Sequence, residues 1–319
     1  MAKNKLMRRA LRLLLRTLLV LFILANTVVA FHAWKFTHFY DYGSISVKKP
    51  GERSGWDVTK DILFGINAMK QRNSVIADSS FEQIQFKTRD GLRLDAWYIP
   101  TDHAIGTVCL FHGHGGTKSG VVREAEMFRK MGYNTLLLDF RAHGASEGNT
   151  CTIGHRESED VKLAYEYIRN KGEKNLVLWG ISMGASTITK AVHDYQLTPQ
   201  KIILEMPFGS IENAAKGRLK LMGLPGQPLA TMLTFWGGLE NGFWAFGLKP
   251  QEYAKDIKCP VLMQWGEKDP RVSRSEEDIL FNNIPGNSKR FVPYSSAGHE
   301  SLCKREPEKW AQEVSSFLR

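Results

Sequence analysis

Short apolar runs alternate with amphipathic segments from Phe81 to the end of the chain. The first two runs, within 81–100, alternate apolar and polar residues and meet at Asp90-Gly91, which predicts a β-hairpin. Continuous apolar runs follow at 107–113, 134–141, 175–180, 201–207, 260–266 and 289–295. Most of them precede a segment with helical spacing. Continuous runs are typical of strands buried on both faces, so the pattern predicts a mostly parallel central sheet flanked by helices.

One connection in this pattern is longer than the others. Residues 209–257 separate two predicted strands and are rich in glycine and aromatic residues. A connection of this length usually forms helices of its own. Two interpretations are open: a helix pair packed on the sheet, or a helical cap that covers the site and lines an apolar acyl pocket. Trp236 and Trp244 are among the apolar residues that would form that pocket. Gly237-Gly238 and Gly242 interrupt the apolar run, which favours a mobile cap.

The N-terminal region has a different pattern. Thr17 to Trp34 contain no Asp, Glu, Lys or Arg, and these 18 residues would span about 27 Å as a helix, enough for a bilayer core. They predict either a transmembrane anchor or a signal peptide cleaved near Ala30. Aromatic residues, Phe36 and Phe39 among them, lie at positions typical of a membrane interface, which favours the anchor. A third interpretation, a buried soluble helix, fits poorly because cations crowd one end.

The charge distribution sets the expected orientation. Of the formal net charge of +10, six charges lie within the first 16 residues, which contain no acid, so the rest of the chain carries +4. The positive end is expected to stay in the cytoplasm and the catalytic domain to lie outside it, or to be secreted if the signal is cleaved. No basic stripe with interleaved aromatic residues is present, so we expect no nucleic-acid partner.

The domain organisation follows from these patterns. Residues 1–35 are predicted to form a basic stub and the transmembrane anchor or signal peptide. Residues 36–80 are expected to form a linker, polar over 41–55, with a leading helix over 56–71. Residues 81–319 are predicted to form the catalytic domain, with the cap insertion at about 209–257. The four cysteines lack metal-ligand spacing and are interpreted as buried thiols.

The motif Gly-x-Ser-x-Gly occurs twice, around Ser146 and around Ser182. A nucleophilic serine on a sharp turn needs a strand that ends at the first glycine and a helix that begins just after the serine. Ser182 fits, because "LVLW" runs into Gly180 and a plausible helix covers 183–195. Ser146 does not fit, because loop-like residues surround it. The sequence therefore predicts Ser182 as the nucleophile.

A serine hydroxyl needs a base and a group that orients the base. His299 follows the last predicted strand, and Asp269 follows the strand before it. Both are expected at the strand edge where Ser182 lies, and the chain order Ser, Asp, His is that of one known class of triads. Glu267 is a rival acid, but it lies closer to its strand.

The oxyanion of an acyl-transfer intermediate needs backbone N–H donors. We expect one from Met183, directly after the nucleophile, and one from His114, in the glycine-rich loop "HGHGG" after the first buried parallel strand. His112 and His114 also have the spacing of a metal pair, but no third ligand has suitable spacing. No metal and no cofactor are therefore expected.

Together these residues resemble the α/β-hydrolase superfamily, in its serine aminopeptidase-like and lipase-like branch. The resemblance covers about Phe81 to Arg319 and rests on the motifs "HGHGG", "DFRAHGASEG", "GISMG", "GEKDPRV" and "AGHE". Relatives usually have glycine where Ala142 stands. The resemblance implies an α/β-hydrolase fold, and it places Ser146 in a structural turn that Asp139, Arg141 and His143 help to fix.

The chemistry and the resemblance predict a serine hydrolase that cleaves a carboxylic ester or related acyl bond through an acyl-enzyme intermediate. Its expected partners are a small-molecule acyl substrate and the membrane, through the N-terminal helix. Two alternatives stay open. One is a small-peptide hydrolase, which would use the same triad. The other is a non-catalytic binding protein of the same fold, which would be expected to lack a triad member.

Overall fold

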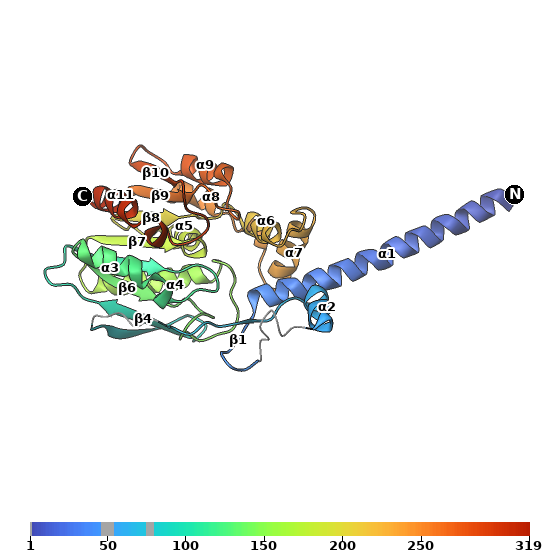
Figure 1. Cartoon of the computed structure of the whole chain (residues 1–319), viewed down its shortest axis with the longest axis horizontal. Helices are drawn as coiled ribbons and strands as arrows, with labels where there is room; N and C mark the ends of the chain where they lie inside the picture. The colour runs from blue at the N-terminus through green and yellow to red at the C-terminus, as the bar shows by residue number, and fades with distance from the viewer. Residues whose placement is uncertain (1, 46–53, 75–79) are drawn as a thin grey trace.

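An eight-stranded sheet forms the centre of the computed structural model, which describes residues 2–45, 54–74 and 80–319 (Figure 1). The strand order is β10-β9-β8-β7-β5-β6-β4-β3. The strands are β3 (Glu82–Lys87), β4 (Arg93–Ile99), β5 (Gly106–Phe111), β6 (Tyr133–Leu138), β7 (Leu176–Ile181), β8 (Lys201–Glu205), β9 (Val261–Gly266) and β10 (Lys289–Tyr294). β3 and β4 are antiparallel, and the six strands from β10 to β6 are parallel. The predicted hairpin and mostly parallel sheet are confirmed.

Helices cover both faces of this sheet. One face packs on α4 (Glu157–Asn170), α5 (Met183–Tyr195) and α9 (Arg274–Asn283). The other packs on α3 (Val122–Lys130), α10 (Leu302–Arg305) and α11 (Pro307–Leu318). Neighbouring residues of β5 alternate between the two cores: Cys109 and Phe111 join the first, and Val108 and Leu110 join the second. This double burial explains why the strand is apolar at every position.

The connection between β8 and β9 contains α6 (Ile211–Leu221), α7 (Leu229–Asn241) and α8 (Pro250–Tyr253), with single 3₁₀ turns at Ala245–Gly247 and Ala254–Asp256. The expectation that glycines interrupt the apolar run was wrong for Gly237-Gly238, because α7 continues through both. A Cβ on Gly238 would lie 2.7 Å from the Phe243 carbonyl oxygen, so this glycine allows close packing. Gly242, with φ of 71°, ends the helix.

The N-terminal region forms one long helix, α1 (Ala2–Thr37). The segment Asn4–Thr37 of this helix is long enough and apolar enough to cross a membrane. The leading helix α2 (Gly55–Phe64) begins at a capping box around Ser54 and is shorter than predicted, because Gly65 takes φ of 76° and ends it. The following β2 (Ala68–Met69) pairs with β1 (Phe39–Tyr40). Of the predicted polar linker, 46–53 lie outside the described residues.

The C-terminal half of α1 packs against the rest of the molecule, beside α7 and α2 (Figure 1). Trp236 on α7 donates its indole N–H to the side-chain oxygen of Asn26 at 3.1 Å. The Phe31 ring meets that of Phe64 with centroids 5.3 Å apart. Beyond the helix, the backbone N–H of Phe39 donates to Asn149 O at 2.8 Å. The residues at the end of α1 are therefore hydrogen-bonded to the loop that follows β6.

Candidate active site

The turn between β7 and α5 holds Ser182 at the edge of the sheet. Ser182 has φ of 54° and ψ of −115°, a left-handed backbone that is strained for a residue with a side chain. The two glycines of the motif are required because a side chain at either position would clash with neighbouring backbone atoms. A Cβ on Gly180 would lie 2.6 Å from the carbonyl carbon of Gly184, and one on Gly184 would overlap the carbonyl of Phe111. The turn is therefore as tight as the motif predicted.

Three side chains from separate strand ends meet at this turn. His299, after β10, has its Nε2 atom 2.9 Å from Ser182 Oγ and its Nδ1 atom 2.6 Å from Asp269 Oδ2. Asp269, after β9, has a fully buried side chain. Its other oxygen accepts the backbone N–H groups of Arg271 at 2.7 Å and Val272 at 3.0 Å. Glu267 is exposed, so the buried carboxylate on the imidazole is that of Asp269.

The carboxylate determines which ring nitrogen of His299 carries the proton. An ionised carboxylate only accepts hydrogen bonds, so the Nδ1–H group donates to Asp269. The neutral ring then has its Nε2 lone pair toward the Ser182 hydroxyl. In this tautomer the imidazole can accept the hydroxyl proton, and the serine oxygen can attack an electrophilic carbon.

The glycine-rich loop after β5 lies directly beside Ser182. A Cβ on Gly113 would lie 3.5 Å from Ser182 Cβ. The Gly116 N–H donates to Gly113 O at 3.0 Å, and the Gly115 N–H donates to His143 Nε2 at 3.0 Å. Within the described part of the chain, neither the His114 N–H nor the Met183 N–H donates to another group. Both amides are therefore free to bind an oxyanion.

Two imidazole rings shape this loop from inside. Phe140 donates its N–H to His112 Nε2 at 3.2 Å, so the His112 Nδ1–H donates to Gly113 O at 2.8 Å. Burial lowers the pKa of His112 to about 3, which keeps the ring neutral near pH 7. The His114 ring instead lies 3.2 Å from the Phe36 carbonyl oxygen. Among the described residues, no group of three His, Cys, Asp or Glu side chains could hold a metal ion.

Ser146, in the second Gly-x-Ser-x-Gly motif, makes hydrogen bonds that stabilise the fold. Its buried hydroxyl donates to Asp139 O at 2.6 Å and accepts the Asp95 N–H at 2.9 Å. Asp139 itself pairs with the buried ammonium of Lys118 at 2.5 Å. The Ser146 hydroxyl is thus occupied as a donor within the loop and as an acceptor by strand β4.

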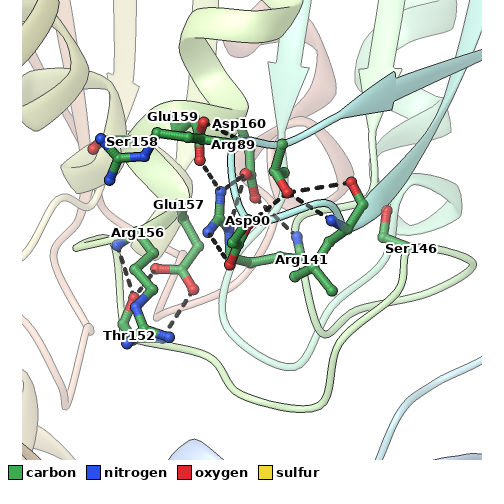
Figure 2. A network of polar contacts seen from close by, with 12 residues as sticks. Arg89, Asp90, Arg141, Ser146, Thr152, Arg156, Glu157, Ser158, Glu159 and Asp160 are labelled. Atoms are coloured by element: carbon green, nitrogen blue, oxygen red, sulfur yellow. Dashed lines mark hydrogen bonds and ion pairs between the residues drawn. The ribbon is translucent and has the colours of Figure 1, made fainter. Parts of the chain in front are cut away.

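A polar network ties this loop to the start of α4 (Figure 2). Arg141 donates from Nε to Asp160 at 2.9 Å and from Nη2 to Glu159 at 2.8 Å. Glu157 accepts the backbone N–H groups of Thr152 and Gly154, each at 2.8 Å. These hydrogen bonds and ion pairs therefore hold the loop after β6 in one shape.

The sequence did not reveal that the end of α1 belongs to this site. The Phe36 ring stacks on the His114 ring with centroids 4.5 Å apart, and Phe39 lies 5.3 Å from the same ring. Both aromatic residues were expected at the membrane interface. The sequence showed only that these two residues follow the apolar segment. It could not show their contact with His114, because the residues are far apart in the chain.

The structure gives no support to an acyl pocket lined by the two tryptophans of the insertion. Trp236 bonds to Asn26 on α1, and Trp244 is 70% exposed. The two helices α6 and α7 pack against each other, and α7 packs against α1. The insertion therefore joins the anchor to the sheet edge.

Comparisons with known proteins agree with this architecture. The model of a protein family described as Hydrolase_4, serine aminopeptidase S33, matches residues 102–236. The lysophosphatidylserine lipase ABHD12 of Danio rerio is 28% identical over 243 residues, 70% of this chain and 61% of that protein. The uncharacterized protein YfhR of Escherichia coli O157:H7 is 30% identical over 250 residues, 75% of this chain and 81% of that protein.

The chain spans about half to three fifths of the length of the ABHD12 relatives that it matches. Among solved structures, the esterase Pf2001 of Pyrococcus furiosus superposes with a TM-score of 0.64 at 22% identity, over 79% of this chain and 98% of that one. An esterase of Exiguobacterium antarcticum superposes with a TM-score of 0.57 at 17% identity, over 74% and 99%. These likenesses establish the fold.

Proposed function

Because the chain belongs to the α/β-hydrolase superfamily, we propose that it is a serine hydrolase that cleaves a carboxylic ester or related acyl bond. The observation that carries the proposal is the pair of hydrogen bonds, at 2.9 and 2.6 Å, that joins Ser182, His299 and Asp269. The strained, glycine-flanked turn presents the hydroxyl at the strand edge, as acyl transfer requires. The esterase and lipase names among the relatives lend support.

The proposed reaction has two halves. Ser182 Oγ attacks the acyl carbon while His299 Nε2 takes its proton, and the buried Asp269 stabilises the imidazolium. The N–H groups of His114 and Met183 bind the oxyanion. The leaving alcohol takes the proton from His299. Water then attacks the acyl-enzyme with His299 as base, which releases the acid and restores Ser182.

A second candidate is a hydrolase of small peptides with the same triad. The family description, serine aminopeptidase, favours it. An inactive binding protein is the weaker alternative, because it would be expected to lack a triad member and all three are present. Turnover of peptide amides beside esters of the same acyl group separates the two active candidates.

We propose that α1 is retained as a single-pass anchor, with the N-terminus in the cytoplasm and the catalytic domain, residues 81–319, outside it. Cleavage near Ala30 would remove the contact between Asn26 and Trp236 and much of the helix that packs on α7. Exposed apolar side chains also lie on α2, on α7 and at the end of α6 with the turn that follows it. They are Trp56, Ile62, Phe64, Leu221, Met222, Leu224, Phe235 and Leu239. Exposed apolar side chains in this part of the molecule suit contact with a bilayer.

Hydrolysis of a short p-nitrophenyl ester tests the activity. The full chain in detergent should release p-nitrophenol, and Ser182→Ala should reduce the rate to that of buffer. A Ser182→Ala protein with undiminished turnover would refute the proposed nucleophile. A mature N-terminus near Phe31, read from protein recovered from membranes, would refute the anchor.

A further inference from the structure

Two arginines flank the candidate active site from different elements. Arg218 lies on α6, and its guanidinium carbon is 5.3 Å from the centroid of the Phe36 ring, which in turn stacks on His114. Arg271 lies two residues after Asp269, and its backbone N–H donates to that carboxylate at 2.7 Å. One arginine therefore approaches from the side of the oxyanion loop and the other from the side of the triad acid.

The backbone packing brings these two elements together. Gly217, next to Arg218, lies so close to Arg271 that a Cβ on Gly217 would be 3.0 Å from Arg271 Cα and would overlap its carbonyl oxygen. Burial foremost, and then the neighbouring His143, Arg218 and Arg271, lower the pKa of the His114 ring to about 3. The two guanidinium groups thus share one region, beside the loop that carries the proposed oxyanion donor.

Neither arginine has an acidic partner. Over residues 2–45, 54–74 and 80–319, no carboxylate lies within ion-pair distance of Arg218 or Arg271, and neither side chain donates a hydrogen bond. Other arginines of the catalytic domain, such as Arg141, Arg274 and Arg290, are paired. Both arginines are exposed, so an anion can reach them from solvent, and a bound anion would offset the repulsion between these two neighbouring cations.

We propose that Arg218 and Arg271 bind an anionic group, a phosphate, on the alcohol side of the ester substrate. The guanidinium fork fits the oxygens of a phosphate, and the site lies beside both the oxyanion donor and the triad. The substrate class is then an acyl ester whose alcohol carries a phosphate, such as an acylglycerol phosphate. This inference rests on the proposed function and adds the charge of the substrate to it.

The experiment compares two substrates with the same acyl chain, a monoacylglycerol and the corresponding acylglycerol phosphate, in uncharged phosphatidylcholine nanodiscs. Wild-type protein should show the higher kcat/KM with the phosphate. Arg218→Gln and Arg271→Gln should each lower kcat/KM for the phosphate ester by about 10- to 100-fold, the usual worth of a hydrogen bond to a charged group. Both should leave the neutral ester nearly unchanged.

Lys220→Gln is the matched control, because Lys220 is an exposed cation on the same helix. It should leave both substrates unchanged. Equal losses on the two substrates in the arginine variants would contradict the anion site and indicate that the arginines only position the loop. Arginine variants that keep the wild-type preference for the phosphate ester would overturn the anion site as well.

A binding arm keeps the test independent of turnover. In a Ser182→Ala background, acylglycerol phosphate should bind more tightly than monoacylglycerol, and each arginine substitution should remove that difference. Failure of the proposed function would be seen as no hydrolysis of either ester, while this arm still reports on the arginines. Inorganic phosphate that competes as well as the phosphate ester would show a site for the free anion and overturn the assignment to substrate.

Discussion

The two sides of the candidate site are held in different ways. On the side of Ser182, the backbone itself fixes the geometry, because a Cβ on Gly180 or Gly184 would collide with neighbouring main-chain atoms. On the side of His114, side chains fix it: Phe36 stacks on the ring at 4.5 Å and offers its carbonyl oxygen at 3.2 Å. The first side is a local turn, and the second is a contact across 78 positions of the chain.

The turn can be recognised in the sequence, whereas the contact between α1 and the oxyanion loop is seen only in the folded structure. A tight turn has a local signature, since few residues fit it. A contact between an apolar helix end and a distant loop has none, because many aromatic residues could make it. Substitutions should therefore act sharply at the turn and more gradually at the anchor.

The largest effect is expected for Asp269→Asn. The amide would bond to the imidazole in the wrong tautomer, so kcat should fall by about 10⁴-fold, as in other triads. Glu267→Gln is the matched control, because this exposed neighbour lies just after the same strand. It should leave kcat within about twofold. Comparable losses in both variants, measured on a p-nitrophenyl ester, would contradict the assignment of Asp269.

Two glycine-to-alanine substitutions contrast the regions in stability. Gly184→Ala places a methyl group against the Phe111 carbonyl, so we expect a loss of about 1–3 kcal/mol or more in the free energy of unfolding. Gly237→Ala lies inside α7 in open space, so we expect a gain of up to about 1 kcal/mol from helix propensity. Unfolding in detergent measures both free energies. A change of the same sign in the two variants would contradict the expected difference between the turn and α7.

Acid should weaken the fold through His112. Its pKa is lowered to about 3 in the folded protein by burial, against about 6.5 when unfolded, so the unfolded state binds the extra proton between these values. Stability from this group is present above pH 6.5 and is lost as the pH falls toward 3. From pH 7 to pH 5 the loss should be about 2 kcal/mol.

The unfolding free energy at the two pH values checks this, with His112→Asn as the variant that should reduce the difference. A fold equally stable at pH 5 and pH 7 would contradict a buried neutral imidazole at this position. The contact of α1 with α7 between Trp236 and Asn26 has no titrating group, so acid should affect the loop first.

The smallest effect is expected at the anchor. Phe36→Ala removes the ring that stacks on His114, a contact worth about 0.5–1.5 kcal/mol, so kcat should fall by about two- to tenfold while KM changes little. Trp34→Ala is the control, because Trp34 stacks on His38 instead. If the two variants have the same kcat, the end of α1 does not position the oxyanion loop.

Much of the fold was predictable because each buried strand and its following helix have a local pattern. The helix expected over 183–195 has those bounds in the structure, and the sheet and hairpin agree with prediction. The helix expected over 56–71 ends early at Gly65, whose left-handed backbone the apolar spacing did not reveal. The continuity of α7 through Gly237-Gly238 was missed because the glycine pair was taken as a break.

For the site, the sequence named Ser182, Asp269 and His299 because each follows a predicted strand, and parallel strands end at one edge. It could not reveal Phe36 or the arginines Arg218 and Arg271. Their positions depend on how α1 and α6 pack against the sheet edge, which no local pattern encodes.

Labelling of the full-length protein with a fluorophosphonate probe, followed by mass spectrometry of its peptides, identifies the nucleophile directly. We expect one adduct on Ser182, lost in Ser182→Ala and His299→Ala and retained in Ser146→Ala. Labelling that persists in Ser182→Ala, or an adduct on Ser146 in the wild-type protein, would refute Ser182 as the nucleophile.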